Sequence, residues 1–294
     1  MKKILTTIVF LCVAVCAAAR TPEYRKGLGE YKIRIGGIER TFKLYLPTNL
    51  SDEAPLVFVL HGYGSSANPD RFGMNPVAEA NGFAVCYPQG ERDGKGKTGW
   101  NVGYPVQQGM KTDDVDFVCR LARHLQKHCK LSKRNTFCTG MSNGGEMCYL
   151  LAYLRPKMFA AVAPVSGLTL EWMYRDLTAK HPVPLFEIHG TKDTTSAWEG
   201  DPENKGGWGK YISVPLAVGY WAAVNRCTHE VTEELPSKRP ESGHRIIAHR
   251  YLGGTNGNEV WLYEIINGKH SWASKDIDTC EEIWRFFSRF VERK

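Results

Sequence analysis

Residues 135–154 read NTFCTGMSNGGEMCYLLAYL, and this segment indicates the architecture of the whole chain. Its first five residues resemble a buried strand, and residues 145–154 have the composition of a helix. Between them, residues 140–144 spell G-x-S-x-G. A sharp strand-to-helix turn needs these glycines, because a Cβ would meet the neighbouring chain, and the turn exposes the serine hydroxyl. The pattern therefore predicts a nucleophilic Ser142 beside a helix N-terminus.

The segments on either side alternate between strands and helices. Residues 55–60 and 82–87 are continuous apolar runs, which are typical of strands covered on both faces. A helix is expected over residues 113–130, with Asp113 or Asp114 as its N-cap. The remaining expected elements are strands at 159–165, 184–189, 245–251 and 259–266, a helix at 277–291, and a hairpin of strands 31–35 and 40–46. The alternation predicts a single three-layer α/β domain with a mostly parallel central sheet.

The N-terminal residues have the pattern of a secretory signal peptide. Lys2 and Lys3 precede an apolar run, residues 4–19, which ends in three alanines. The run is shorter than the roughly 20 residues that a membrane-spanning helix needs. We therefore expect a signal peptide over residues 1–19, a secreted or periplasmic protein, and no stable membrane insertion. Cys16 leaves a lipoprotein as an alternative, although Val15 fits a lipid-attachment site poorly.

Composition argues against several classes of partner. The formal net charge is +7 at pH 7, and the basic residues are scattered along the chain, so the sequence does not indicate a nucleic-acid partner. Metal-ligand spacings such as C-x-x-C or H-E-x-x-H do not occur, so neither a metal nor another cofactor is expected. Cys227 and Cys280 lie in segments predicted to be peripheral, and they could form a disulfide in an oxidising compartment.

A serine hydroxyl is a weak nucleophile unless a base and an orienting acid accompany it. Asp193 follows the strand predicted at 184–189, and His270 follows the strand predicted at 259–266. The order serine, acid, histidine is the one expected when the nucleophile lies in this kind of turn. Because parallel strands end at one edge of a sheet, Ser142, Asp193 and His270 are predicted to meet there as a catalytic triad.

Other residues compete for these roles. Asp176 and Asp201 also lie between the serine and the histidine. His61 and His189 follow or end strands but precede Asp193, so we expect them to orient loops through ring hydrogen bonds.

The loop after the strand at 55–60 is a candidate for half of an oxyanion hole. Its sequence is His61-Gly62-Tyr63-Gly64, and the glycines would let the backbone N–H of Tyr63 turn inward. The backbone N–H of Asn143 would be the second donor.

Tryptophans are the candidate substrate-binding residues. The indoles of Trp100, Trp198 and Trp272 are predicted in loops at the active-site end, where they could stack on a sugar ring or a hydroxycinnamoyl group. The alternative is that they pack the loops.

Four motifs together resemble a known group of enzymes. They are Leu60-His61-Gly62, Gly140-Met141-Ser142-Asn143-Gly144-Gly145, His189-Gly190-Thr191-Lys192-Asp193 and Gly268-Lys269-His270-Ser271-Trp272. The chain is similar to the secreted feruloyl esterase, acetylxylan esterase and polyhydroxybutyrate depolymerase group of α/β-hydrolases. In that group the triad would fall on Ser142, Asp193 and His270. Two positions depart from the usual pattern, Lys269 and Ala273, where the group has glycine and proline.

The resemblance implies an α/β-hydrolase domain over residues 20–294 that hydrolyses carboxylic esters without a cofactor. We expect plant-cell-wall-derived esters as substrates, feruloyl esters first and acetylxylan close behind, presented on a small molecule, an oligosaccharide or a polysaccharide. A polyester depolymerase, a serine peptidase and a non-catalytic glycan-binding homologue are the alternatives.

Overall fold

The computed structural model describes residues 23–292, so the expected signal peptide and Cys16 lie outside the described residues. The strands are β1 Gly27–Ile35, β2 Ile38–Leu46, β3 Leu56–Leu60, β4 Ala84–Pro88, β5 Glu91–Arg92, β6 Thr98–Gly99, β7 Thr136–Met141, β8 Ala161–Val165, β9 Leu185–Gly190, β10 His229–Leu235, β11 Arg245–Leu252 and β12 Val260–Ile266. The helices are α1 Pro69–Phe72, α2 Met74–Asn81, α3 Asp114–His128, α4 Asn143–Leu154, α5 Glu171–Asp176, α6 Val214–Val224 and α7 Thr279–Ser288, with 3₁₀ turns at Pro105–Gln107, Pro240–Ser242 and Thr255–Gly257.

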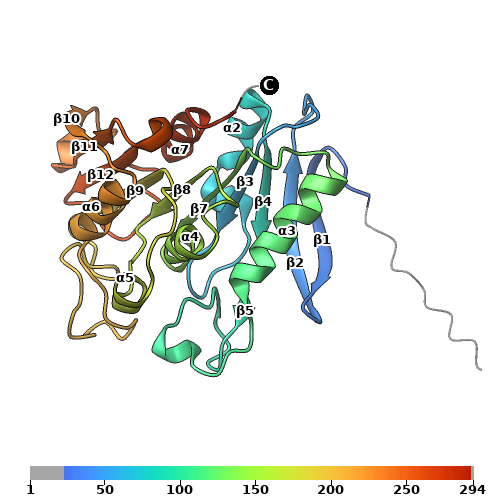
Figure 1. The fold of residues 1–294 in the computed structure, drawn as a ribbon, viewed down its shortest axis with the longest axis horizontal. Helices are drawn as coiled ribbons and strands as arrows, with labels where there is room; N and C mark the ends of the chain where they lie inside the picture. The colour runs from blue at the N-terminus through green and yellow to red at the C-terminus, as the bar shows by residue number, and fades with distance from the viewer. Residues whose placement is uncertain (1–22, 293–294) are drawn as a thin grey trace, which may run out of the picture.

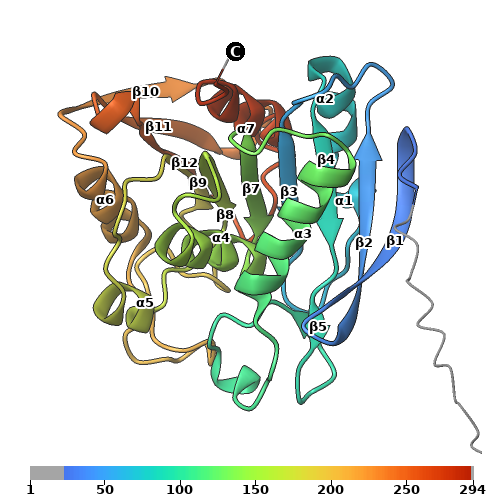
Figure 2. The same ribbon diagram turned by 45° about the vertical axis from the view of Figure 1, so that its right-hand side comes forward.

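Ten of the strands form one sheet, in the order β1-β2-β4-β3-β7-β8-β9-β12-β11-β10 (Figure 1). From β4 to β12 every neighbouring pair is parallel, and the outer strands β1, β2, β11 and β10 pair antiparallel. Because the central strands are parallel, the loops that follow β3, β7, β9 and β12 reach the same edge of the sheet. Figure 2 shows these loops at the lower end of the molecule, near β5 and α5.

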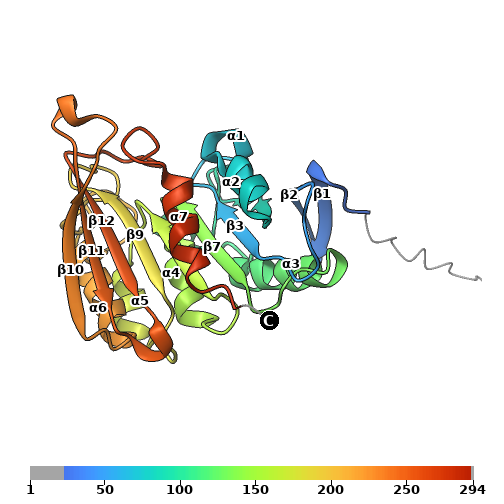
Figure 3. The same ribbon diagram turned by 90° about the horizontal axis from the view of Figure 1, so that it is seen from above.

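Helices cover both faces of the sheet, which explains why its central strands are apolar on both sides (Figure 3). One buried cluster joins the sheet to α3, α4 and α6, and a second joins it to α1, α2 and α7. Strands β3, β4, β7, β8 and β9 are buried at every position. The prediction of a three-layer α/β domain is therefore confirmed.

Individual elements also agree with the sequence patterns. The hairpin of β1 and β2 turns at Gly36 and Gly37, both of which have positive φ angles (61° and 82°), as a tight two-residue turn requires. Asp113 is the N-cap of α3, and its side chain accepts from the N–H of Asp116. The edge strand β10 was not predicted, because its side chains are mostly exposed and carry no apolar alternation.

The predicted disulfide between Cys227 and Cys280 is wrong. Both thiols are free in the structure. Cys280, in α7, belongs to the cluster on one face of the sheet, whereas Cys227 packs against the cluster on the other face. The sheet therefore separates the two sulfurs.

Within residues 23–292, none of the helices has both the length and the apolar character needed to cross a membrane.

Candidate active site

Ser142 stands between β7 and α4 in a backbone conformation that is rare for a residue with a side chain, with φ 56° and ψ −124°. The flanking glycines make this turn possible. A Cβ on Gly140 would lie 2.6 Å from the backbone of Gly144, and a Cβ on Gly144 would lie 2.3 Å from the carbonyl oxygen of Leu60. Residues 140–144 therefore both hold Ser142 in a strained conformation and allow β3 to approach closely.

Asp193 and His270 are joined directly. Asp193 Oδ2 and His270 Nδ1 form a hydrogen bond of 2.7 Å. The other carboxylate oxygen of Asp193 accepts from the N–H groups of Thr195 and Ser196, both at 2.8 Å. Burial acts to raise the pKa of Asp193, but these hydrogen bonds and the nearby histidine charges outweigh burial and lower it. Asp193 is therefore held as a carboxylate that fixes the orientation of the His270 ring.

A short chain of contacts brings the loop of His270 to the serine turn. The N–H of Ser142 donates to the carbonyl of Val165 at 2.8 Å. The next residue, Ser166, donates through its hydroxyl to the carbonyl of Ser271 at 3.2 Å. Ser271, the residue after His270, is therefore bound to Ser166, and Ser166 follows Val165, the backbone partner of Ser142. Ser142 and His270 themselves are not hydrogen-bonded in this structure, so the contact between them stays a prediction.

The two proposed oxyanion donors are the N–H of Asn143, which follows the serine in the chain, and the N–H of Tyr63, which belongs to the loop after β3. Ser142 packs closely under the loop after β3, where a Cβ on Gly62 would lie 3.3 Å from the Cβ of Ser142. Within residues 23–292, neither the N–H of Tyr63 nor that of Asn143 donates to a protein acceptor. His61 holds this loop, since its Nδ1 bonds the carbonyl of Gly62 at 2.8 Å and its Nε2 accepts from Gly90 N at 2.9 Å. The expectation that His61 orients a loop is confirmed.

Sequence reasoning missed a buried network behind Asp193. His189 is fully buried, with Nδ1 2.8 Å from Glu187 Oε1 and Nε2 2.8 Å from the carbonyl oxygen of Ser196. Its Nε2 is also 3.7 Å from Asp193 Oδ2. Burial acts to lower the pKa of His189, but the hydrogen bond and charge of Glu187, together with the Ser196 carbonyl, outweigh burial and raise it. Asp193 therefore lies between two histidines, one facing the site and one in the interior. The expectation that His189 orients a loop is confirmed by its bond to Ser196, and the sequence sign of the rest of the network was Glu187, a charged residue inside an apolar strand.

A second buried network lies under Asn143. The Asn143 side chain accepts from the N–H of Trp100 at 2.6 Å and donates to the Trp100 carbonyl at 3.1 Å. It also donates to Glu146 at 3.4 Å, and the hydroxyl of Tyr104 donates to the same carboxyl group. Burial raises the pKa of Glu146 to about 8. Glu146 is therefore a protonated acid at neutral pH, and it supports the first turn of α4 as a neutral group.

The structure corrects part of the expectation about tryptophans. Trp100 is 0% exposed, and its indole N–H donates to the His61 carbonyl at 2.8 Å. Trp272 is 5% exposed and donates to the carbonyl of Phe72 at 3.0 Å. These two indoles pack the loops instead of facing a substrate. Trp198 is half-buried beside His189, with the ring centroids 6.0 Å apart, so its contact with a substrate stays a prediction.

A group of three aromatic rings borders the oxyanion loop. The ring of Trp208 lies 5.5 Å from that of Tyr63 and 5.3 Å from that of Tyr104, and the two tyrosines are 6.1 Å apart. Trp208 and Tyr63 are half-buried, whereas Tyr104 is buried. Trp208 belongs to the loop before α6, so it reaches Tyr63 only in the folded chain.

Within residues 23–292, no group of three or more His, Cys, Asp or Glu side chains has the arrangement of a metal site.

Comparisons with known proteins show what this chain is similar to. Residues 40–181, just under half of the chain, match the family model described as Esterase PHB depolymerase. A bifunctional acetylxylan esterase/xylanase of Neocallimastix patriciarum is 31% identical over 170 residues, which cover 57% of this chain and 23% of that protein. Feruloyl esterase D of Neurospora crassa is 25% identical over 321 residues, which cover 97% of each protein.

Among solved structures, the acetyl xylan esterase from Aspergillus awamori has a TM-score of 0.61 at 15% identity, covering 90% of this chain and all of that one. A likeness at this identity concerns the fold alone. Together the matches confirm the similarity to the feruloyl esterase, acetylxylan esterase and depolymerase group, and they confirm that this chain has the α/β-hydrolase fold.

Proposed function

We propose that this protein is a serine-dependent carboxylic ester hydrolase that acts on esters attached to plant-cell-wall polysaccharides. The observation that carries this proposal is the Asp193–His270 hydrogen bond of 2.7 Å. The His270 loop is anchored to Ser166, which follows the backbone partner of the strained Ser142. Acyl transfer requires an acid-oriented imidazole that can reach a serine hydroxyl.

In the proposed mechanism, His270 removes the proton of the Ser142 hydroxyl as its Oγ attacks the ester carbonyl. Asp193 holds the tautomer of the ring and stabilises the imidazolium that forms. The N–H groups of Tyr63 and Asn143 receive the negative charge of the tetrahedral intermediate. The imidazolium then protonates the leaving alcohol, and a water molecule repeats the sequence on the acyl-enzyme to release the acid.

Feruloyl esters are the first choice of substrate. Feruloyl esterase D of Neurospora crassa matches over nearly the whole of both chains. The aromatic group of Tyr63, Tyr104 and Trp208 begins at the oxyanion loop itself, and a hydroxycinnamoyl ring could pack against such a surface. Acetylated xylan is the second candidate, because the relative of highest identity among those above is named as an acetylxylan esterase.

The test combines labelling with a substrate panel. A fluorophosphonate probe should label the purified protein at Ser142, and Ser142→Ala should lower hydrolysis of methyl ferulate by on the order of 10⁴-fold or more. The matched control is Ser274→Ala, an exposed serine that should keep wild-type activity. Near wild-type hydrolysis by Ser142→Ala would refute the mechanism.

Methyl ferulate, acetylated xylan, a 3-hydroxybutyrate oligomer and a peptide amide should be compared by kcat/KM. A preference for methyl ferulate supports the first choice of substrate. A preference for the polyester oligomer or the amide would replace it with a depolymerase or a peptidase, and a lack of both labelling and turnover would indicate a glycan-binding protein.

A further inference from the structure

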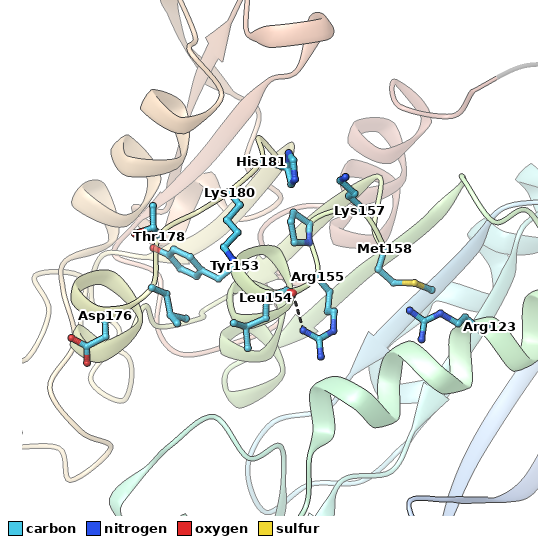
Figure 4. Close-up of a pocket in the computed structure, with 12 residues that line it drawn as sticks. Arg123, Tyr153, Leu154, Arg155, Lys157, Met158, Asp176, Thr178, Lys180 and His181 are labelled. Carbon is cyan, nitrogen blue, oxygen red and sulfur yellow. Dashed lines mark hydrogen bonds between the residues drawn. The ribbon is translucent and has the colours of Figure 1, made fainter.

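A basic hollow lies at the edge of the sheet opposite Ser142. It is found where α4 ends, about 18 Å along the helix axis from the serine turn. The hollow has a volume of about 730 Å³, and a second one of about 830 Å³ adjoins it, with Arg123 and Met158 lining both. We call the two together the basic groove. Figure 4 shows Arg123, Lys157 and Lys180 around the first hollow, with Tyr153 and Leu154 between them.

The groove carries more positive charge than its carboxylates can balance. Six exposed cations line it and form no ion pair within residues 23–292: Arg123, Lys127, Lys133, Arg155, Lys157 and Lys180. Of the three lining carboxylates, Asp52 pairs with Lys130 and Asp176 pairs with Arg175. Only Glu53 is left to face six cations, so the groove has a strongly positive potential.

The ends of helices explain only part of this charge. The C-termini of α3 and α4 meet here, and cations in a last helical turn interact favourably with the helix dipole. Lys127 fits that explanation. Lys133, Lys157 and Lys180 lie in loops beyond the helix ends, where the dipole effect has fallen off, so the dipole leaves them unexplained.

The floor of the first hollow is apolar. Tyr153, Leu154 and Met158 line it, and Leu154 is 38% exposed. Tyr153 is 3% exposed and its hydroxyl is buried, so the hydroxyl is not available to a ligand. A ligand that fits this hollow would offer an apolar surface and negative charges.

We infer that the basic groove binds a polysaccharide segment that carries uronic-acid carboxylates. The C–H face of a sugar ring can pack on the apolar floor, and its carboxylates can meet the lysines and Arg123. Single-stranded nucleic acid fits less well, because it stacks its bases on exposed aromatic rings and Tyr153 is nearly buried. A membrane surface fits less well too, because only Leu154 is exposed among the floor residues Tyr153, Leu154 and Met158.

This inference rests on the proposed function in one respect, which is the choice of a polysaccharide as the polyanion. The groove is too far from Ser142 to hold the reacting ester. It would instead hold a remote part of the same polymer, so that ester groups are present near the serine at a higher local concentration.

The test measures binding and hydrolysis separately. Isothermal titration calorimetry with glucuronic-acid-substituted xylan oligosaccharides compares the wild type with Lys157→Glu/Lys180→Glu. The control is Arg34→Glu/Lys111→Glu, which reverses two exposed cations outside the groove. We expect the groove variant to bind about tenfold more weakly, the control to bind as the wild type does, and salt to weaken binding. All three proteins should hydrolyse methyl ferulate equally, which shows that they are folded.

Three results would overturn the inference. One is equal binding by the wild type and the groove variant. Another is equal binding of the carboxyl-reduced oligosaccharides, which lack the negative charge. The third is tighter binding of single-stranded DNA or of anionic lipid vesicles than of the acidic xylan. If the fluorophosphonate probe labels none of the proteins and none hydrolyses any ester of the panel, but the acidic xylan binds as expected, the proposed function fails while the groove assignment stands.

Discussion

Replacing Glu146 by glutamine should make the stability of this protein less dependent on pH. The side chain is fully buried, and burial raises its pKa from 4.5 to about 8. Between these two pH values the native protein holds a proton that the unfolded chain has released. Stability therefore falls as pH rises through this range, because the native state binds more protons than the unfolded state. Glutamine has the same shape and does not ionise.

The size of the effect follows from the pKa difference. Each pH unit between the unfolded and folded pKa values corresponds to about 1.4 kcal/mol for one proton. Over the range from 4.5 to about 8 the loss of unfolding free energy reaches at most about 5 kcal/mol. Glu146→Gln should retain this free energy at the alkaline end, because its amide can still accept from Tyr104.

Urea unfolding followed by tryptophan fluorescence, repeated at intervals between about pH 5 and 8, measures the effect. The control is Glu79→Gln. Hydrogen bonds from Thr48 and Tyr45 lower the pKa of the half-buried Glu79 below 4.5, so its contribution changes only at more acid pH and the control should follow the wild type. If the difference in unfolding free energy between wild type and Glu146→Gln is the same at both ends of the range, the reasoning is refuted.

Two other variants test the supports of the site. Gly144→Ala should destabilise the protein by about 3 kcal/mol or more in the same urea assay, because its Cβ would lie 2.3 Å from a carbonyl oxygen of β3. The control is Gly94→Ala, which has open space around it and should change stability by less than about 0.5 kcal/mol. Equal effects of the two substitutions would contradict this prediction. His189→Gln should cost about 3 kcal/mol below pH 6.5, because it leaves Glu187 buried without its cation. The pKa of His189 is raised, so its stabilisation is lost as pH rises through the folded pKa; a cost independent of pH would argue against a charged His189.

The architecture was largely predictable because its determinants are local. A strand covered on both faces is apolar at nearly every position, and β3 and β4 therefore appear as unbroken apolar runs. The serine turn was equally visible, since only glycine can occupy Gly140 and Gly144 without a clash. The parallel direction of the strands then predicted that Asp193 and His270 would reach one edge, and the hydrogen bond between them agrees with that prediction.

Interactions that depend on which segments become neighbours were not predictable in the same way. Trp100 and Trp272 lie in loops at the expected end, but the folded chain buries both. The two peripheral cysteines lie on opposite faces of the sheet. In each case the sequence pattern indicates a residue's place along the chain and leaves its three-dimensional neighbours open.

For this chain, the amino-acid order alone establishes the α/β alternation, the glycine-flanked Ser142 and the succession of serine, acid and histidine. These features depend on backbone sterics and on apolar periodicity within a few residues. Folding adds the charge arrangements: His189 behind Asp193, a protonated Glu146 under Asn143, and cations scattered in sequence but gathered in one groove. Electrostatic interactions act through space and depend on burial, so they arise only once distant segments have been packed together.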